Sequence, residues 1–366
     1  MSALLTVYEK AMPGELGWRE KLEAAKDAGF DGLEISIDET DAKLSRLDWT
    51  SEQRRELLLL TRETGMCVQT MCLSGHRKYP LGSSDPAICA RGMEIAQKAI
   101  DFAYDVGIRI IQLAGYDVYY EESTPETRAR FGANLKNVVN MAAEKGVILA
   151  FETMETPFMN TVAKAMAYVD AVRSPYLQVY PDVGNISNGT ADVAADIEAG
   201  WGHIAAAHLK ETVPGIFRDR HYGDGAVDFP LVTRKLREQG VGLYNAEFWY
   251  DLTYKNGDWQ GALKEAHDFL RPLLETQPIL VSALTSQVIS NVPAAILLSP
   301  FTQNAKGLLL GTNIGGLGTI IASLASVISF QFYSKEADAQ VGRYMGWFTI
   351  LNFALFAILM LLSYII

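Results

Sequence analysis

The chain contains little cysteine and little histidine, and both shortages exclude classes of protein. Its 366 residues include three cysteines, Cys67, Cys72 and Cys89. Because this number is odd and the spacing uneven, we exclude a disulfide scaffold or a zinc knuckle and expect reduced thiols in a cytosolic protein. Five histidines and an acidic net charge argue against a multi-zinc nuclease. The opening MSALLTVYEK has no basic region and only a very short apolar stretch, so we do not expect a signal peptide.

Positive charge is scarce, and the charges are unevenly distributed. Lysine and arginine number 32 against 43 aspartates and glutamates, a net charge of −11, and no basic run with interleaved aromatics is present, so we expect no nucleic-acid partner. The last 91 residues hold five charged side chains, which are Lys306, Lys335, Glu336, Asp338 and Arg343. We therefore expect two domains, a water-soluble one over residues 1–276 and one of near-membrane composition over 277–366.

The soluble domain shows eight strand-then-helix units. Its short apolar runs are mostly continuous rather than alternating, which favours parallel strands covered by helices. The predicted strands are Leu4–Tyr8, Gly32–Ile37, Val68–Leu73, Arg109–Ala114, Ile148–Phe151, Leu177–Pro181, Ile204–Ala207 and Leu243–Ala246. This order predicts an α/β fold, a (β/α)8 TIM barrel, followed by an all-α hydrophobic segment of membrane type. An open doubly wound sheet is the alternative, but no G-x-G-x-x-G follows the first strand.

Helix boundaries between these strands are marked by capping residues. Thr50 and Gln53 have the spacing of a capping box at the start of a helix that should end at Gly65. Thr124, with a proline directly after it, should start another helix that ends at Gly146.

Four residues of metal-ligand type follow four successive predicted strands. Glu152 follows the fifth, Asp182 the sixth, His208 the seventh and Glu247 the eighth. Because the carboxyl ends of barrel strands meet at one mouth, we expect these side chains to converge. Three buried carboxylates would repel one another strongly unless a cation lay among them. The pattern therefore predicts a divalent metal site.

The predicted ligand set also indicates a type of chemistry. Three carboxylates and one imidazole favour Mn²⁺, Mg²⁺, Co²⁺ or Zn²⁺ with positions open for a substrate. Such a metal can hold two adjacent sugar oxygens and polarise a carbonyl, which acidifies the neighbouring C–H. Glu152 and Glu247, facing each other across the metal, would then act as base and acid on opposite faces of that carbon. This arrangement suits the inversion of a stereocentre beside a ketone.

Several motifs of the soluble domain resemble one known family. They are Tyr8-Glu-Lys-Ala11, Asp38–Asp41 with Leu44–Trp49, Met71–Arg77, Gln112–Tyr120, Thr156–Asn160 and Tyr180–Asn185. From about residue 4 to about 275 the chain closely resembles the L-ribulose-5-phosphate 3-epimerases. These bacterial enzymes of L-ascorbate and pentose catabolism are also called L-xylulose-5-phosphate 3-epimerases and belong to the xylose-isomerase-like barrels.

The resemblance implies a reaction and roles for the four residues. It implies a metal bound by Glu152, Asp182, His208 and Glu247. It also implies that Glu152 and Glu247 exchange the C3 proton of L-ribulose 5-phosphate and L-xylulose 5-phosphate through a metal-held enediolate. Related non-phosphorylated ketose 3-epimerases have a histidine three residues after the aspartate ligand, where this chain has Asn185. That difference leaves the contacts to the sugar hydroxyls open.

A pentulose 5-phosphate needs cationic or N–H donors at the barrel mouth. Basic side chains and backbone N–H groups in the loops after the strands are the candidates for binding substrate or phosphate. They are Lys10, His76, Arg77, Lys78, Lys210, Gly223 and Gly225, together with Asn185. Surface loop charges are the alternative interpretation of the basic residues. Glu155 resembles a residue behind the ligands rather than a ligand.

The C-terminal domain has three long apolar stretches, 278–301, 307–333 and 344–366. Each is long enough to cross a bilayer, so we expect two to three transmembrane helices. Ser290-Asn-Val-Pro293 and Gly311-Thr-Asn313 resemble the C-terminal end of anion permeases of the arsenite/citrate/dicarboxylate superfamily. Such breaks mark either the discontinuous helices of a transporter or close helix packing through the G-x-x-x-G of Gly311 and Gly315. A fragment of this size predicts no independent transport.

The location follows from the same features. The acidic, cysteine-reduced barrel favours the cytoplasm, which would make the C-terminal domain an anchor at the inner face of a membrane and the whole chain membrane-associated. The alternative is a gene-fusion artefact near residues 275–278. For function, an aldose–ketose isomerase and a non-catalytic sugar-phosphate-binding part of a transport protein remain alternatives, and a homo-oligomer remains open.

Overall fold

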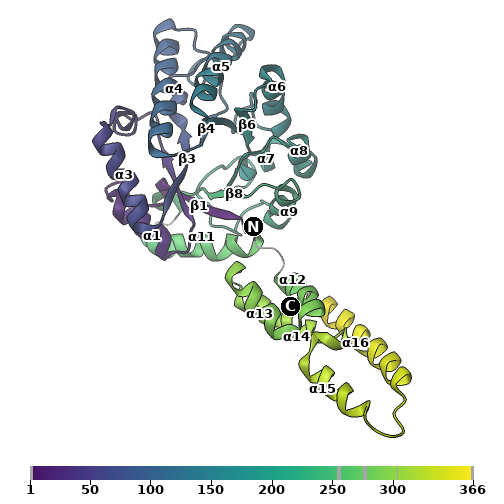
Figure 1. Cartoon of the computed structure of the whole chain (residues 1–366). Helices are drawn as coiled ribbons and strands as arrows, with labels where there is room; N and C mark the ends of the chain where they lie inside the picture. Colours follow the sequence, from purple (N-terminus) through teal and green to yellow (C-terminus); the bar gives the residue numbers. More distant parts are fainter. Residues whose placement is uncertain (1–2, 254–256, 275–277, 303, 364–366) are drawn as a thin grey trace. The chain divides into compact units, whose positions relative to one another are not determined.

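The computed structural model describes residues 3–253, 257–274, 278–302 and 304–363. The described chain divides into two compact units, one formed by Ala3–Leu274 and one that begins C-terminal to it. The first unit is the barrel and the second consists of helices (Figure 1).

Eight parallel strands form the centre of the first unit. They are β1 (Leu4–Tyr8), β2 (Gly32–Ser36), β3 (Cys67–Leu73), β4 (Ile110–Ala114), β5 (Ile148–Glu152), β6 (Leu177–Tyr180), β7 (Ala207–Leu209) and β8 (Leu243–Ala246). Their order is β6-β5-β4-β3-β2-β1-β8-β7. Parallel bridges from Val179 to Ile204 and from Asp182 to His208 join β6 to β7. The sheet therefore closes on itself, and the predicted (β/α)8 barrel is confirmed.

Helices surround the strands (Figure 1). They are α1 (Trp18–Asp27), α2 (Asp41–Leu44), α3 (Ser51–Thr64), α4 (Pro86–Val106), α5 (Pro125–Lys145), α6 (Val162–Val172), α7 (Val183–Gly189), α8 (Val193–Ala199), α9 (Phe229–Glu238), α10 (Tyr250–Thr253) and α11 (Trp259–Leu274). Short 3-10 turns follow three strand or helix ends, η1 (Glu9–Ala11), η2 (Ser45–Asp48) and η3 (Ser74–Arg77).

The predicted helix caps are present. Thr50 Oγ1 accepts a hydrogen bond from the Gln53 N–H at 3.3 Å, and Gln53 Oε1 accepts one from the Thr50 N–H at 2.9 Å. Together these bonds satisfy two amide groups that the first turn of α3 would otherwise leave unpaired. Gly65 and Gly146 end α3 and α5 with φ of 72° and 67°, a left-handed conformation that favours glycine.

The barrel has an apolar shell and a polar centre. Strand side chains such as Leu5, Leu33 and Ile111 are fully buried with helix side chains in one core cluster. Both faces of the strands are covered, which explains their continuous apolar runs. Equally buried polar side chains on the strands include Thr6, Glu34, Thr70, Gln112, Asn245 and His208. Four of these six lie on β1 to β4, while His208 and Asn245 lie on β7 and β8, two of the strands that carry the candidate site.

One strand differs from its predicted position. We predicted Ile204–Ala207, whereas β7 spans Ala207–Leu209 and pairs His208 with Asn245 of β8. The apolar run ends at Ala207, but the ladder continues because a partner strand satisfies the backbone of His208. Apolar composition therefore placed the strand two to three residues too early, and His208 lies within β7 rather than after it.

The second unit contains five α-helices and two 3-10 turns among its described residues. They are α12 (Pro278–Ile289), α13 (Asn291–Leu298), η4 (Ser299–Phe301), α14 (Ala305–Gly315), η5 (Ile320–Ala322), α15 (Leu324–Tyr333) and α16 (Val341–Ser363). The first two apolar stretches are therefore not continuous helices: Ser290, with φ of 71°, separates α12 from α13. Among the described residues, α16 is the one helix long and apolar enough to cross a membrane, judged by its 23 residues and mean hydropathy of 2.1.

Small residues bring α12 and α14 together. A side chain at Gly311 would collide with Ser282 Oγ, and one at Gly315 would lie 2.7 Å from Ala283 Cα. Gln287 Nε2 donates to the carbonyls of Gly315 and Leu317, each at 2.8 Å. The contacts support the close-packing interpretation of the G-x-x-x-G spacing.

We expect a protein of residues 1–274 to fold as the barrel does in the whole chain. Its core cluster runs from Leu5 to Leu274, whereas the helices of the second unit have a separate cluster of Ala283, Ile314 and Met360. Removing the second unit should therefore leave one cooperative thermal unfolding transition, measured by circular dichroism with the full chain in detergent as the control. Loss of the near-ultraviolet signal in the shortened protein would show that the barrel loses its tertiary packing without the second unit. It would contradict the interpretation that the two units have independent cores.

Candidate metal centre

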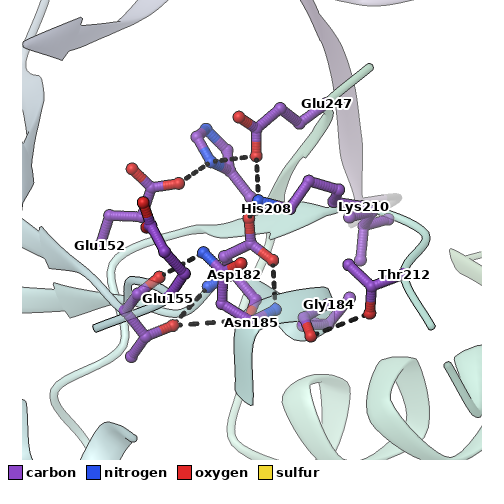
Figure 2. A network of polar contacts seen from close by, with 12 residues as sticks. Glu152, Glu155, Asp182, Gly184, Asn185, His208, Lys210, Thr212 and Glu247 are labelled. Atoms are coloured by element: carbon purple, nitrogen blue, oxygen red, sulfur yellow. Dashed lines mark hydrogen bonds and ion pairs between the residues drawn. The ribbon is translucent and has the colours of Figure 1, made fainter. Parts of the chain in front are cut away.

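Four side chains from successive strands meet at the barrel mouth. Glu152 is the last residue of β5, Asp182 and Glu247 lie just beyond β6 and β8, and His208 lies within β7. All four are buried, and one ligand atom from each lies within 4.8 Å of all the others. Figure 2 shows them converging, with His208 between the two glutamates. The arrangement follows from the barrel, because closure brings these strands side by side.

The imidazole of His208 contacts carboxylates through both ring nitrogens. Nδ1 lies 2.9 Å from Glu152 Oε1 and 3.1 Å from Glu247 Oε2. Nε2 lies 2.7 Å from Oε1 of Glu34, which comes from β2. The nitrogen Nδ1 therefore faces the other members of the cluster, and Nε2 faces away from them.

Asp182 is fixed by the backbone around it. Its Oδ1 accepts a hydrogen bond from the Asn185 N–H at 2.8 Å, which caps α7, and its own N–H donates to Thr153 Oγ1 at 3.0 Å. Lys210 Nζ lies 2.5 Å from Asp182 Oδ2 and 3.5 Å from Glu247 Oε2. Burial raises the pKa of Asp182 despite the nearby ammonium. Lys210 therefore contributes positive charge inside the cluster.

The two glutamates have pKa values shifted in opposite directions. Burial raises the pKa of Glu152, and the negative charge of Glu247 raises it further. Burial also acts to raise the pKa of Glu247, but the positive charges of Lys210 and His208 outweigh it and hold that pKa below its ordinary value. Burial disfavours the imidazolium of His208, yet the surrounding carboxylates raise its pKa. In the metal-free protein one glutamate therefore binds a proton more readily than the other.

The chemistry of the cluster fits a divalent cation. The four residues and their contacts Lys210 and Glu34 together hold two cationic groups, Lys210 and His208, and four buried carboxylates, Glu34, Glu152, Asp182 and Glu247. Asp182 Oδ2 and Glu247 Oε2 share the single ammonium of Lys210, at 2.5 Å and 3.5 Å. A divalent metal ion would balance the excess negative charge, and three carboxylates with one imidazole are a donor set that suits it.

A cavity of about 540 Å³ opens over the cluster. Among the residues that line it are Lys10, Arg77, Glu152, Glu155, Asn185, Lys210, Arg218, Glu247 and Trp249. Arg218 was not predicted; its guanidinium carbon lies 4.6 Å from the centre of the Trp249 ring. This arginine belongs to the long loop between β7 and α9, where no periodic pattern marks a functional position.

Three of the predicted phosphate ligands lie elsewhere. His76 is buried, its Nε2 lies 3.1 Å from the carbonyl oxygen of Gly92, and burial lowers its pKa to about 4. The N–H of Gly223 donates to Glu211 Oε2 at 2.9 Å, and a side chain at Gly225 would overlap the same carboxylate. The glycine turn therefore binds an internal carboxylate, and His76, Gly223 and Gly225 are not among the cavity-lining residues.

Of the remaining predicted residues, Lys10, Arg77, Asn185 and Lys210 line the cavity, whereas Lys78 is not among the residues that line it. Lys10 Nζ forms an ion pair with Asp38 at 2.6 Å. The Arg77 guanidinium carbon lies 5.0 Å from the centre of the Tyr119 ring. Asn185 Nδ2 donates to the Thr153 carbonyl at 2.7 Å.

Glu155 also lines the cavity, and its Oε2 accepts a hydrogen bond from Tyr116 OH at 2.6 Å. It is not one of the four residues that meet at the barrel mouth.

Two buried polar residues behind the cluster were missed by the sequence analysis. Gln112 of β4 donates through Nε2 to Glu152 Oε2, and Glu34 of β2 contacts His208. Each interrupts an apolar strand, as Gly-Leu-Glu-Ile-Ser and Ile-Ile-Gln-Leu-Ala. A polar residue at the centre of a strand buried on both faces is the signal that would have found them.

The barrel is also matched by known proteins. The family model described as a xylose isomerase-like TIM barrel matches residues 22–273. The chain belongs to this family of xylose isomerase-like TIM barrels.

Relatives within these barrels are named epimerases. The L-ribulose-5-phosphate 3-epimerase UlaE of Salmonella typhimurium strain LT2 is 51% identical over 246 residues, which cover 67% of this chain and 87% of the relative. The protein of the same name from Salmonella paratyphi B is 50% identical over the same shares. These relatives place the chain among enzymes of the isomerase class.

Solved structures show the same fold at low identity. A D-psicose 3-epimerase with D-tagatose from Clostridium cellulolyticum H10 matches with a TM-score of 0.64 and 17% identity, over 75% of this chain and all of that one. An L-ribulose 3-epimerase matches with a TM-score of 0.60 and 22% identity, over 75% of this chain and 95% of the other.

We expect a divalent metal to stabilise the folded barrel. Metal-free protein, prepared with a chelator, should gain thermal stability when Mn²⁺, Co²⁺ or Zn²⁺ is added, because the ion offsets repulsion among Glu152, Asp182 and Glu247. At a free concentration about 100-fold above the dissociation constant the gain should be about 2.7 kcal/mol. Differential scanning calorimetry measures it. The exposed Glu144→Gln variant is the matched control and should gain equally, whereas Asp182→Asn should gain less. No gain with any of these ions would contradict the site.

Proposed function

We propose that the barrel is a metal-dependent 3-epimerase that interconverts L-ribulose 5-phosphate and L-xylulose 5-phosphate. The observation that carries this proposal is the pair Glu152 and Glu247, buried in one cluster on either side of His208 Nδ1. Two relatives with 51% and 50% sequence identity are named L-ribulose-5-phosphate 3-epimerase, and they support the choice of substrate.

A divalent metal held by Glu152, Asp182, His208 and Glu247 would polarise the ketose carbonyl and so acidify the C3–H bond. One glutamate takes the C3 proton, and the electron pair of the broken C–H bond forms the C2–C3 double bond of an enediolate. The other glutamate returns a proton to C3 from the opposite face, which inverts the centre. The roles exchange for the reverse reaction.

The surroundings of the two glutamates suit these complementary tasks. Their pKa values move apart in the metal-free protein, upward for Glu152 and downward for Glu247. A proton donor paired with a proton acceptor is what an inversion through two groups needs. Gln112 holds the carboxylate of Glu152 from behind, and Lys210 lies beside Glu247.

Cationic side chains at the cavity wall support a phosphorylated substrate. Lys10 and Arg77, both predicted, line the cavity together with Arg218. Arginine forms two parallel hydrogen bonds with a phosphate, so Arg77 and Arg218 offer donors of the required geometry. We assign the phosphate to the two arginines of this wall, because Lys210 and Lys10 already form ion pairs with Asp182 and Asp38.

The two-base mechanism predicts exchange with solvent. In D₂O the L-xylulose 5-phosphate that the enzyme forms from L-ribulose 5-phosphate should carry deuterium at C3, as followed by NMR and mass spectrometry. Glu152→Gln and Glu247→Gln should each lower epimerisation by roughly 10²–10⁴-fold, because each removes one proton-transferring group. Metal analysis of each variant separates loss of a base from loss of the ion, and Glu144→Gln should be fully active.

Two outcomes would contradict this mechanism. Undiminished C3 exchange in both glutamine variants would show that other groups carry the proton. Deuterium at C1 rather than C3 would indicate an aldose–ketose isomerase on the same barrel.

We further propose that the barrel lies in the cytoplasm and that α16 anchors the chain in a membrane. Its 23 residues extend about 34 Å at 1.5 Å per residue, enough for a hydrocarbon core of about 30 Å. Met360 is the one buried side chain among the described residues of α16. Large apolar side chains such as Trp347, Ile350 and Leu361 are more than half exposed within the second unit. A helix that is apolar on all sides suits lipid rather than water.

Flotation tests the anchor. The full chain should float with vesicles of phosphatidylethanolamine and phosphatidylglycerol in a density gradient, whereas a protein of residues 1–274 should stay in the soluble fraction. The shortened protein should keep the kcat/KM of the full chain, because the cluster and its cavity belong to the barrel. A full chain that stays soluble without vesicles or detergent would contradict the anchor. Loss of turnover in the shortened protein would instead favour a transport subunit.

A further inference from the structure

Glu34 is a fully buried carboxylate that the proposed reaction does not use. It lies in the middle of β2, opposite Tyr8 of β1 and Thr70 of β3. It is completely inaccessible to solvent and is not among the residues that line the cavity. A buried charge of this kind is costly unless its surroundings satisfy it, so its contacts indicate what it does.

Four groups contact the Glu34 carboxylate, two at each oxygen. Oε2 accepts hydrogen bonds from Thr70 Oγ1 at 2.7 Å and from Tyr180 OH at 3.2 Å. Oε1 accepts one from Asn245 Nδ2 at 2.9 Å and lies 2.7 Å from His208 Nε2. A carboxylate can only accept hydrogen bonds. The proton between Glu34 and His208 therefore belongs to Nε2 of the histidine.

The amide of Asn245 bridges Glu34 and Thr6. Its Nδ2 donates to Glu34, which as a carboxylate can only accept, and its Oδ1 accepts a hydrogen bond from Thr6 Oγ1 at 2.9 Å. Glu34 is consequently held by neighbours on β3, β6 and β8 and has little freedom to move away from His208.

The other ring nitrogen of His208 faces the cluster. Nδ1 lies 2.9 Å from Glu152 and 3.1 Å from Glu247, the two glutamates of the proposed reaction. The ring also packs edge-on against Tyr180, with 4.8 Å between centroids and 65° between planes. A ring flip would exchange each nitrogen with a ring carbon, so that Cε1 would face Glu34 and Cδ2 would face the two glutamates.

We propose that Glu34 is a positioning residue that fixes the tautomer and the ring orientation of His208, so that the Nδ1 lone pair points to the divalent metal. By holding the Nε2 proton, the carboxylate also makes the imidazole a more basic ligand. The proposal rests on the proposed metal site, and not on the identity of the sugar. Glu34 touches neither substrate nor metal and acts through His208 alone.

Metal affinity of the full chain in detergent tests this role. The Zn²⁺ dissociation constant, measured by competition with a chromophoric chelator, should rise by about 10–100-fold in Glu34→Gln. The absorption spectrum of bound Co²⁺ should change as well, because it reports on ligand geometry. Asp117→Asn is the matched control: Asp117 is a fully buried carboxylate whose contacts are Ser123 and Thr127. Its affinity and spectrum should equal those of the parent.

An unchanged dissociation constant in Glu34→Gln would overturn the proposal. A merely structural role predicts a lower melting temperature of the metal-free variant with the parent's metal affinity, which would also overturn it. If the parent itself binds no divalent metal, the proposed function and this inference fail together. A parent that binds metal and a Glu34→Gln variant that binds it equally well would remove this inference alone.

A second measurement needs no variant and therefore does not depend on whether Glu34→Gln folds. In Zn²⁺-loaded protein labelled with ¹⁵N-histidine, NMR should show His208 protonated at Nε2 and coordinated through Nδ1. The opposite assignment, a proton on Nδ1 with Nε2 coordinated, would overturn the proposal.

Discussion

Repulsion among buried carboxylates is the constraint on which the barrel mouth depends. Four carboxylates lie around one imidazole and one ammonium, and all six groups are buried. At such short separations in a protein interior, unbalanced charges interact far more strongly than they would in solvent. The fold tolerates this cluster because the polar centre of the barrel supplies donors from several strands. The same excess of negative charge favours the binding of a divalent cation.

The supporting polar residues explain why the barrel interior departs from the usual apolar filling. Glu34, Gln112, Tyr180 and Asn245 come from the four even-numbered strands, where bulky aliphatic side chains usually pack. Here Gln112 contacts Glu152 and Glu34 contacts His208. The apolar core lies instead between the strands and the surrounding helices.

The sequence was informative where a residue's chemistry and the barrel topology together dictate its position. Continuous apolar runs followed by Glu152, Asp182 and Glu247 sufficed to place three strand ends, because parallel strands expose their carboxyl ends on one face. The boundary of β7 was wrong, since an alanine run does not show that His208 continues the ladder. Composition also does not show which way a side chain or an N–H group points. The His76 side chain points to the backbone of α4, and the Gly223 N–H points to the carboxylate of Glu211.

The order of the ligands around the barrel gives the proposed two-base exchange a structural reason. Strands β5 to β8 follow one another around the closed sheet, so their ligands form an arc. The two glutamates lie at the ends of this arc, while Asp182 and His208 lie between them. Groups at the ends of an arc approach a substrate bound over its centre from different sides, which neighbouring strands cannot do. In the proposed reaction Glu152 and Glu247 would therefore reach one carbon from opposite sides, while Asp182 and His208, at the inner positions, would hold the ion.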